Sequence, residues 1–418
     1  MAGSRGTTAT HERARDRLDA VGERLRELSR DVYTHPEAAF EEHRAVRAVA
    51  ALLVETGFSA DIGCYGLPTA LRAAFGSGDL HVVLCAEYDA LPGLGHACGH
   101  NIIAAASVGA ALALAAVAAE TGMRVTVLGT PAEEHGGGKV LMLRQGAWDD
   151  ATISMMAHPA PVDAWPTTNV MQAVHRLTVD FSGTPAHAAV TPHEGRNAGD
   201  AATLALVAVG LLRQQTEEVA RFNAIITGAG ALTNVIPDQS RVEVEVRHRT
   251  AADLLRLEER VLACFNGAAL ATGCGWTWRE SEPLYAELIQ DGWLAGRFGT
   301  HLRATGRMVD PTEAQHSGGS TDMGNVSQVV PSIHPVIGVT GAAGPIHTVH
   351  FAEASGSPAA DDALHDAALA LAWTAIDLAM DPQRRAEYLR RQRERPRSSQ
   401  TAATEPGDGT DRGVPAGG

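Results

Sequence analysis

The 418-residue sequence is poor in cysteine and in positive charge. Its five cysteines form no C-x-x-C pair, and their odd number argues against a disulfide framework. A reducing cytoplasm is therefore the expected location. Lys and Arg number 34 against 49 Asp and Glu, which gives a formal net charge of −15. Because nucleic-acid binding needs a basic face, this balance excludes a general nucleic-acid-binding protein.

The sequence also lacks clear membrane segments. The N-terminal stretch MAGSRGTTATHERARDR has no apolar core of the kind that a signal peptide needs. One long apolar run, residues 102–119, is just long enough to cross a bilayer. It is rich in Ala and Gly and has no comparable partner span, so we expect a buried core helix and no membrane contact.

The composition is that of a globular protein with more than one domain. Hydrophobic residues make up 45% and charged residues 20% of the chain, whose length is that of two ordinary domains. Expected strands alternate with expected helices in the first half. These elements are helices at 12–30 and 44–57, a strand at 81–87, a helix at 102–119, a strand at 125–130, a helix at 138–145 and a strand at 151–158. The alternation predicts an α/β sheet with helices on its faces.

The pattern changes after about residue 170 to the order β-α-β-β-α-β, which is typical of a small ferredoxin-like unit. The elements are a strand at 175–183, a helix at 196–219, strands at 223–228 and 241–249, a helix at 251–273 and a strand at 275–280. The α/β character resumes near 285 and ends in helices at 357–380 and 382–393.

We therefore expect a discontinuous catalytic α/β domain that is interrupted by a smaller α+β domain. The catalytic domain is expected to comprise residues 12–171 and 284–393, and the smaller domain residues 172–283. The ends of the chain, 1–11 and 394–418, are expected to be disordered tails, because the second is rich in Pro, Gly, Ser and Thr.

Polar clusters follow three of the expected strands, where sites gather in open α/β sheets. After the strand at 81–87 come Glu87, Asp89, His96, Cys98 and His100. A thiolate and an imidazole two residues apart in a Gly-rich loop can face one metal ion. The competing interpretation is a loop thiol with incidental histidines.

The second cluster is Glu133 and Glu134, after the strand at 125–130. Adjacent carboxylates can divide the work, one binding metal and the other taking a proton from the attacking water. Equally, acidic residues favour a solvated helix start.

The third cluster contains His158 after the strand at 151–158, and a fourth contains His347 and His350. Each of these histidines taken alone is more often structural than functional. Together with the cysteine and the paired glutamates, they can supply two metals about 3.5–4 Å apart that share one bridging ligand.

With these motifs in view, the sequence closely resembles the aminoacylase/carboxypeptidase family of dinuclear metallo-exopeptidases. It is most similar to the branch of aminobenzoyl-glutamate hydrolases, amino-acid-conjugate hydrolases and β-alanyl-lysine dipeptidase-like proteins. The matching stretches are HPEAAFEE (35–42), AEYDALPGLGHACGHN (86–101), GTPAEEHGGGK (129–139), MMAHP (155–159), FSGTPAHAAVTPHEGRNAGDA (181–201), LTNVIPD (232–238), GGSTDMGNVS (318–327) and HTVHF (347–351).

The resemblance implies a role for each matching residue. Cys98 would bridge two divalent metal ions, and the other ligands would be His100, Glu134, His158 and His347. Glu133 would be the general acid/base, and Asp89 would orient the site. His187 of the smaller domain would reach the partner subunit's active site and steady the oxyanion. The weaker candidates for gripping a substrate carboxylate are Asn234 and Arg247.

The implied activity is metal-dependent hydrolysis of the amide bond of an N-acyl amino acid, an aminobenzoyl-glutamate-like conjugate or a dipeptide. A thiolate bridge favours zinc, with manganese and cobalt as alternatives. The smaller domain resembles the family's dimerisation and lid module, so a homodimer is expected. Two residues, Asn101 and His135, differ from those that are common at these positions in the family, and they bear on substrate or metal preference. His350 competes with His347 for the last ligand position.

Three other interpretations stay open. A cysteine-nucleophile hydrolase would use Cys98 with His96 or His100, and chelators would leave it active. A non-catalytic binding protein on the same scaffold would usually have lost metal ligands, and none is lost here. Ureide hydrolysis on the same fold is less favoured than amide hydrolysis by the C-x-H motif and the EYDALP loop.

Overall fold

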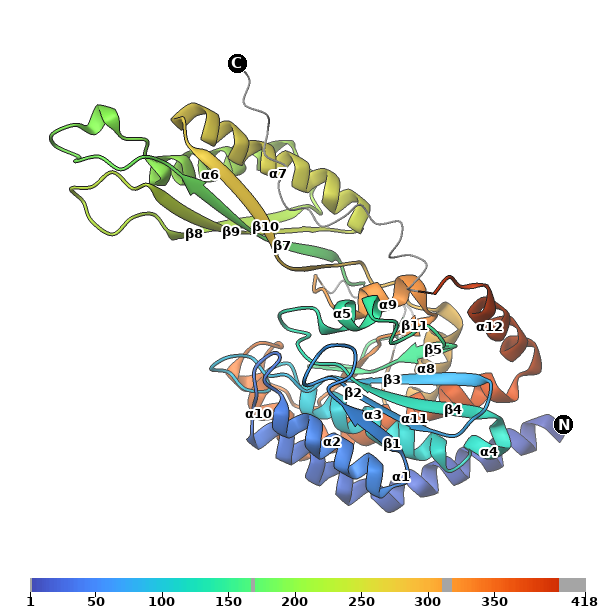
Figure 1. Ribbon diagram of the computed structural model, residues 1–418. Coiled ribbons are helices and arrows are strands. Elements are labelled where there is room, and N and C mark those ends of the chain that lie inside the picture. Colours follow the sequence, from blue (N-terminus) through green and yellow to red (C-terminus); the bar gives the residue numbers. More distant parts are fainter. Residues whose placement is uncertain (1, 167–169, 310–317, 398–418) are drawn as a thin grey trace. The chain divides into compact units, whose positions relative to one another are not determined.

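The computed structural model describes residues 2–166, 170–309 and 318–397, and it divides into two compact units (Figure 1). The described part of unit 1 lies within residues 1–171 and 288–403, and the described part of unit 2 is Gln172–Glu287. The chain thus leaves unit 1, builds unit 2 and returns. The expected smaller domain, 172–283, lies within unit 2.

Unit 1 is built on a six-stranded mixed sheet in the order β1-β2-β4-β3-β5-β11. β3, β4, β5 and β11 run parallel, whereas β1 and β2 pair antiparallel at one edge. The bounds are β1 Ser59–Ile62, β2 Leu71–Phe75, β3 Leu80–Ala86, β4 Met123–Gly129, β5 Ile153–Met155 and β11 Ser332–Ile333. A separate parallel pair is formed by β6 His158–Ala160 and β12 Val336–Gly338. The mixed α/β class expected for this part of the chain is confirmed.

Helices cover both faces of this sheet. The large core lies between one face of the sheet and helices α1, α3 and α11, and a smaller core lies between the other face and helices α5 and α9 (Figure 1). The helices of unit 1 are α1 Ala2–Thr34, α2 His43–Glu55, α3 His100–Ala115, α4 Ala118–Thr121, α5 Gly138–Arg144, α8 Gly292–Ala304, α9 Met323–Val329, α10 Val349–Ser355, α11 Pro358–Met380 and α12 Pro382–Glu394.

The apolar run at 102–119 forms most of α3, in which every residue from His100 to Leu114 is buried. An apolar helix without a polar face is stable where packing surrounds it, as α1, α11 and β3 do here. Among the described residues, α11 is the one helix that is long and apolar enough to cross a membrane, and 78% of its most apolar window is buried inside unit 1.

The expectation of a disordered tail over 1–11 is wrong for the described residues, because α1 begins at Ala2. The first turns are anchored: Thr10 is buried, and Trp373 Nε1 donates a hydrogen bond to the carbonyl of His11 at 3.1 Å. The other expected tail begins at residue 394, where α12 ends, and residues 398–418 lie outside the described residues.

Unit 2 has the expected β-α-β-β-α-β order. Its elements are β7 Ala173–Ser182, α6 Ala198–Leu212, β8 Arg221–Gly228, β9 Gln239–His248, α7 Ala251–Thr272 and β10 Gly275–Tyr285. The strands form one antiparallel sheet in the order β10-β7-β9-β8, and both helices lie on the same face (Figure 1). Alternate residues of β9 are buried against the helices, which leaves the other face of the sheet to solvent. Unit 2 is therefore ferredoxin-like.

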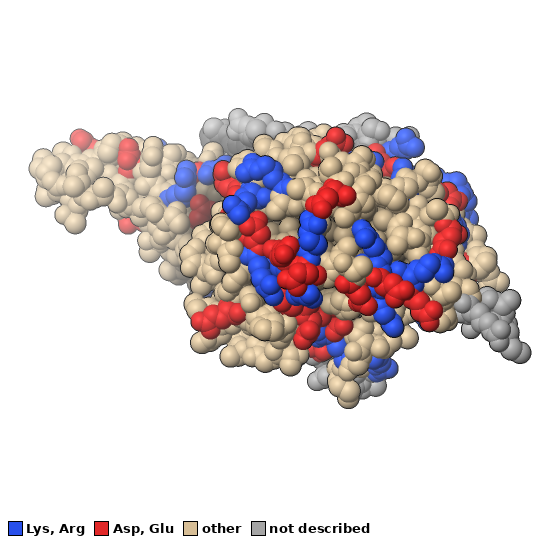
Figure 2. Space-filling view, turned by 90° about the horizontal axis from the view of Figure 1, so that it is seen from below, with Lys and Arg blue, Asp and Glu red and all other residues tan. Residues whose placement is uncertain are grey.

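Charges of both signs are interspersed on the face of the molecule seen from below in Figure 2. Arg24 pairs with Glu55 at 2.6 Å and Arg44 with Asp31 at 2.5 Å, and both pairs are exposed. Such neutralised pairs do not make the basic face that nucleic acid requires.

Asp377 joins three helices and offers a test of how α1 is held. Its carboxylate lies 3.1 Å from His11 Nε2 of α1 and 2.7 Å from His301 Nε2 of α8, and it also binds Arg297. We expect Asp377→Asn to destabilise the protein by about 1–3 kcal/mol, because the buried His301 and the partly buried His11 and Arg297 lose a charged acceptor. Thermal unfolding would show a midpoint several degrees lower. Asp362→Asn, on the exposed side of the same helix, is the control, and an equal effect of both variants would contradict the assignment.

Candidate metal centre

The polar loops of unit 1 meet at one edge of the sheet because β3, β4 and β5 are parallel, so their carboxyl ends point the same way. β3 leads into Glu87 and Asp89, and β4 leads into Glu133 and Glu134. The expected strand at 151–158 is interrupted: β5 ends at Met155, and His158 opens β6, which pairs with β12.

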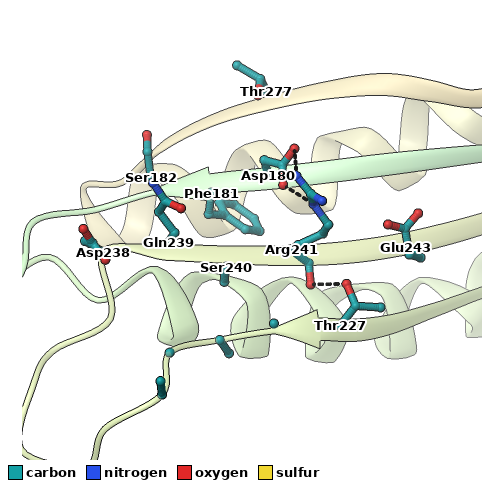
Figure 3. Close-up of a pocket in the computed structure, with 14 residues that line it drawn as sticks. Asp180, Phe181, Ser182, Thr227, Asp238, Gln239, Ser240, Arg241, Glu243 and Thr277 are labelled. Atoms are coloured by element: carbon teal, nitrogen blue, oxygen red, sulfur yellow. Dashed lines mark hydrogen bonds and ion pairs between the residues drawn. The ribbon is translucent and has the colours of Figure 1, made fainter.

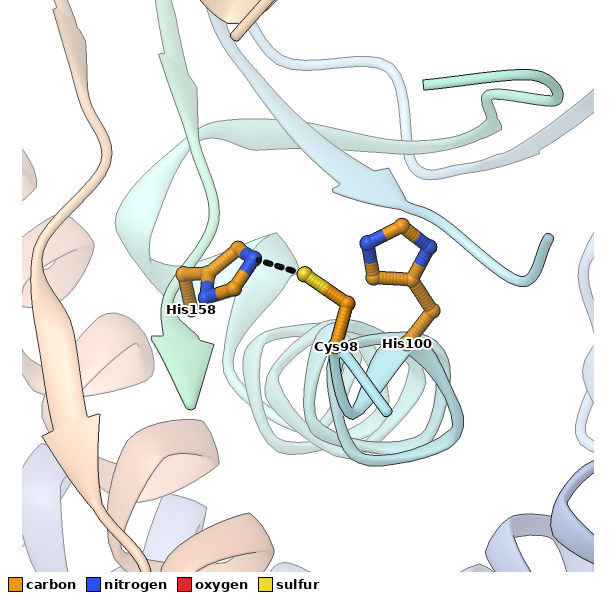
Figure 4. Close-up of side chains that lie close together, drawn as sticks. All are labelled: Cys98, His100 and His158. Atoms are coloured by element: carbon orange, nitrogen blue, oxygen red, sulfur yellow. Dashed lines mark hydrogen bonds between the residues drawn. The ribbon is translucent and has the colours of Figure 1, made fainter. Parts of the chain in front are cut away.

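Cys98, His100 and His158 form the first group of converging side chains, with Cys98 between the two imidazole rings (Figure 4). Cys98 Sγ lies 3.3 Å from His158 Nε2, and one donor atom of each residue lies within 4.8 Å of the other two. Gly99 makes the turn between Cys98 and His100 with a φ of 77°, and a Cβ there would lie 2.5 Å from Pro159. Only glycine allows this close approach without strain.

Cys98, Glu134 and His347 form a second group by the same 4.8 Å criterion, so the thiol of Cys98 belongs to both groups. Glu134 Oε2 lies 3.3 Å from His347 Nε2. The His347 side chain is 49% exposed, whereas that of Glu134 is 8% exposed, so the cluster opens to solvent beside His347. His350 lies elsewhere, 3.9 Å from Glu353 on the surface.

The donor set fits two divalent cations. His100 Nε2 and Glu134 Oε1 are buried 3.9 Å apart, and neither has a hydrogen-bond partner among the described residues. Buried polar atoms without partners are costly, and a cation is one way to satisfy them. One thiolate, three imidazoles and a carboxylate are ligands typical of zinc and neighbouring transition metals.

Asp89 contacts one residue of each group of candidate ligands. Its Oδ1 accepts from His100 Nδ1 at 2.9 Å, and its Oδ2 accepts from the backbone N–H of Glu134 at 3.0 Å. Burial opposes ionisation, but His100 and these hydrogen bonds outweigh it and hold the pKa of Asp89 at about 2. A carboxylate in this place fixes the orientation of the imidazole, as partners of metal-binding histidines commonly do.

The two adjacent glutamates have opposite electrostatic environments. Burial, followed by the charges of Glu87 and Glu134, raises the pKa of Glu133 well above its ordinary value. Burial acts on Glu134 too, but His347 and His100 outweigh it and lower its pKa. Glu133 Oε2 lies 3.8 Å from His100 Nε2, at the margin of the cluster. Such divergent pKa values are typical of a proton-transfer group beside a ligand.

Sequence reasoning gave no role to a buried ion triad beside the cluster. The Lys139 ammonium is fully buried and lies 2.6 Å from Glu87 Oε1 and 2.7 Å from Asp322 Oδ1. Glu87 Oε2 is in turn 3.5 Å from His100 Nε2. Lys139 and Asp322 lie in stretches that match the family, GTPAEEHGGGK and GGSTDMGNVS. They are so far apart in sequence that nothing in the sequence indicated that they pair.

A second residue without an assigned role is Glu42, from the matching stretch HPEAAFEE. It is fully buried, and its Oε1 accepts hydrogen bonds from the backbone N–H of Phe40 and of Ala132, both at 2.9 Å. Burial raises the pKa of the Glu42 carboxyl to about 7, and the charge of Asp89 adds to the rise.

The predicted residues of the smaller domain are described within unit 2 alone. His187 is exposed on a loop that bridges to Val235, and the N–H of Ala188 donates to the Asn234 carbonyl at 3.0 Å. These two candidates are therefore neighbours. Arg247 is not brought to them: it lies near the far end of β9, where its Nε donates to Glu245 Oε1 at 2.7 Å.

Unit 2 also has a hollow on the open face of its sheet (Figure 3). Asp180 and Arg241 pair across it at 2.6 Å, and its lining contains neither histidine nor cysteine. The hollow therefore offers no imidazole or thiol as a metal ligand. Of the two departures noted in the sequence, Asn101 holds α3 by donating to Ser29 Oγ and the Ser355 carbonyl, both at 2.9 Å, and His135 is exposed.

Comparison with known proteins gives a consistent picture. Residues 83–372 match the model of peptidase family M20/M25/M40. The chain is 40% identical over 386 residues to an Xaa-Arg dipeptidase of Mus musculus, covering 88% of this chain and 89% of that protein. It is 32% identical to one of the p-aminobenzoyl-glutamate hydrolase subunits of Escherichia coli, over 62% of this chain and 57% of the relative.

Among solved structures, a dinuclear metal-binding peptidase of the M20 family from Bacillus subtilis superposes with a TM-score of 0.65 at 22% identity. The match covers 86% of this chain and 99% of that structure, so the two share a fold over the matched part.

The raised pKa of Glu42 predicts a pH dependence of stability in the metal-free protein. Below pH 4.5 this carboxyl is protonated in both the folded and the unfolded chain. Between pH 4.5 and about 7 the unfolded chain ionises first, so the folded state loses stability as the pH rises. We expect wild type to lose on the order of 3 kcal/mol relative to Glu42→Gln across this window. Unfolding of both proteins from pH 4.5 to 8 measures the difference, and a constant difference would contradict the buried, protonated carboxyl.

Proposed function

This chain belongs to peptidase family M20/M25/M40, and from that premise we propose that it uses two divalent cations to hydrolyse the amide bond of a dipeptide or N-acyl amino acid. The observation that supports the proposal most directly is the place of the Cys98 thiol, which is common to two groups of converging donors. We assign His100 and His158 to one cation, and Glu134 and His347 to the other.

The cations, when bound, would polarise the scissile carbonyl and lower the pKa of the attacking water. The chain's own residues perform the proton transfers. The Glu133 carboxylate takes the proton from the attacking water and delivers it to the nitrogen of the leaving amine. Its buried place at the margin of the donor cluster and its raised pKa support this role. Asp89 keeps the His100 ring in register by accepting from its Nδ1.

We propose further that the protein is a homodimer in which unit 2 forms the contact. Three large apolar residues of α6, Leu204, Val207 and Leu211, have exposed fractions of 39%, 54% and 70%. β8 is an edge strand and exposes 55% of Ile225. A second copy of the chain that packs on this face of α6 and along β8 would remove the apolar side chains and the unpaired strand edge from water. His187 of the partner subunit would then donate a hydrogen bond to the developing oxyanion.

The names of the relatives support a choice of substrates to test. Because the 40% identical relative is named an Xaa-Arg dipeptidase, we propose dipeptides with a C-terminal basic residue as the first substrates to test. N-acyl amino acids and aminobenzoyl-glutamate form the second panel. Sensitivity to a chelator separates this mechanism from a Cys98 nucleophile, which would need no metal. Zinc as the metal and a cytoplasmic location stay predictions, which metal analysis and cell fractionation test.

Replacing Glu133 by Gln tests the proton-transfer role. The amide keeps the shape of the side chain but cannot accept a proton, so we expect turnover to fall by at least about 10²-fold. Metal content, measured by mass spectrometry, is expected to match wild type. A fully metal-loaded Gln variant with wild-type turnover would refute the assignment.

Mixing two inactive variants tests whether His187 acts across the dimer. His187→Ala subunits keep Glu133, and Glu133→Gln subunits keep His187. A homodimer of His187→Ala is expected to be nearly inactive, because removing an oxyanion donor costs about 10²–10³ in rate. A mixed dimer contains one complete site of two, so we expect up to about half of wild-type turnover from such dimers. Native mass spectrometry verifies that mixed dimers form. If they form and stay inactive, His187 does not act in trans.

A further inference from the structure

The stretch HPEAAFEE has no part in the function proposed above, yet it contacts both loops that carry the candidate ligands. The Glu37 carbonyl accepts the N–H of Ala90 at 2.8 Å, next to Asp89. Glu42 accepts the N–H of Ala132 at 2.9 Å, next to Glu133. One short segment between α1 and α2 therefore supports the loops after β3 and β4 at the same time.

The contact made by Glu42 has an unusual feature. Its Oε1 accepts from two backbone N–H groups, and the residues that donate, Phe40 and Ala132, both have a left-handed backbone, with φ of 64° and 59°. For residues other than glycine this conformation costs roughly 1–2 kcal/mol, so it persists only where the surroundings impose it. Ala132 immediately precedes Glu133, and its backbone angles decide where the Glu133 side chain points.

The Phe40 ring makes a second contact with the same turn. A Cβ on Gly136 would lie 2.3 Å from the ring, so the ring rests directly on the backbone of Gly136. The turn is closed internally by the N–H of Gly138, which donates to the Ala132 carbonyl at 3.3 Å. The turn that contains Glu133 is thus supported by Phe40 on one side and by Glu42 on the other.

We propose that Glu42 is a positioning residue for amide hydrolysis: by binding the N–H of Ala132 it holds the left-handed turn that aims Glu133 at the reacting atoms. The inference rests on the proposed function, in which Glu133 transfers the proton. Glu42 acts through the backbone, since its hydrogen bonds reach Phe40 and Ala132 and no candidate metal ligand. A small displacement of a proton-transfer group can cost about 10²-fold in rate, so a distant carboxyl can govern turnover in this way.

The test compares variants that keep or remove the acceptor oxygen. Glu42→Gln keeps an oxygen at the same distance, so turnover is expected to stay within a few-fold of wild type. Glu42→Leu removes it, and we expect kcat to fall about 10- to 100-fold with KM and metal content unchanged. Glu41→Leu, at the exposed neighbouring position, is the matched control. Wild-type kcat in Glu42→Leu, or an equal loss in Glu42→Gln, would overturn the proposal.

A second substitution separates positioning from general stability. Glycine adopts the left-handed conformation freely, so Ala132→Gly removes the need for a residue that enforces it. We expect Glu42→Leu with Ala132→Gly to recover part of the lost kcat, even if its melting temperature stays low. No recovery would count against the proposal. Should Glu42→Leu fail to fold, Glu42→Asp, whose oxygen is one methylene short of Ala132, replaces it in the same comparison.

Hydrogen exchange of the metal-free proteins gives a readout that needs no substrate. The peptide that covers residues 130–138 is expected to exchange faster in Glu42→Leu than in wild type, and at nearly the wild-type rate in Glu42→Gln. If wild type hydrolyses none of the offered amides, the proposed function fails while this comparison still decides whether Glu42 holds the turn. If wild type is active and exchange is the same in all three proteins, the positioning role fails alone.

Discussion

The cluster around Cys98 depends on one electrostatic constraint: it gathers more acidic side chains than basic ones in a small buried space. The side chains of Glu87, Asp89, Glu133 and Glu134 lie together around His100 at the carboxyl edge of the sheet, and the Lys139 ammonium lies 2.6 Å from one of them, Glu87. Burying an unpaired charge costs several kcal/mol. Proton uptake, which the raised pKa of Glu133 favours, relieves part of this cost, and bound cations would relieve more. Two divalent cations that share the Cys98 thiol would supply positive charge here.

Three further side chains support the candidate ligands and Glu133. Asp89 holds a candidate ligand and the backbone of its neighbour, Lys139 neutralises the carboxylates behind His100, and Glu42 supports the turn before Glu133. Asp89 follows β3, Lys139 lies in α5 after β4, and Glu42 lies in the segment between α1 and α2, so the three contacts come from different parts of the chain. The buried α3 gives the carboxyl edge of the sheet a rigid floor, because His100 begins that helix. The candidate site is therefore held by backbone contacts as well as by side-chain contacts.

Much of the fold could be predicted from periodicity, since β3, β4, α3 and α7 have long apolar or amphipathic patterns. The strands β1 and β2 could not, because β1 is a short and mostly exposed edge strand and β2 pairs with β4, which is remote in sequence. The helical start of the chain was missed because its anchors, such as Asp377, lie at the other end of the sequence. At the site, local motifs singled out the candidate donors. The buried roles of Lys139 and Glu42 could not be predicted, because charged residues are normally exposed and their partners are remote in sequence.

The central claim is that two cations share the thiol of Cys98. Anomalous X-ray diffraction from crystals of the metal-loaded protein tests it directly. We predict two anomalous peaks about 3.5–4 Å apart with the Cys98 sulfur between them, one beside His100 and His158 and the other beside Glu134 and His347. A single peak, or two peaks that Cys98 does not join in a fully active protein, would contradict the claim.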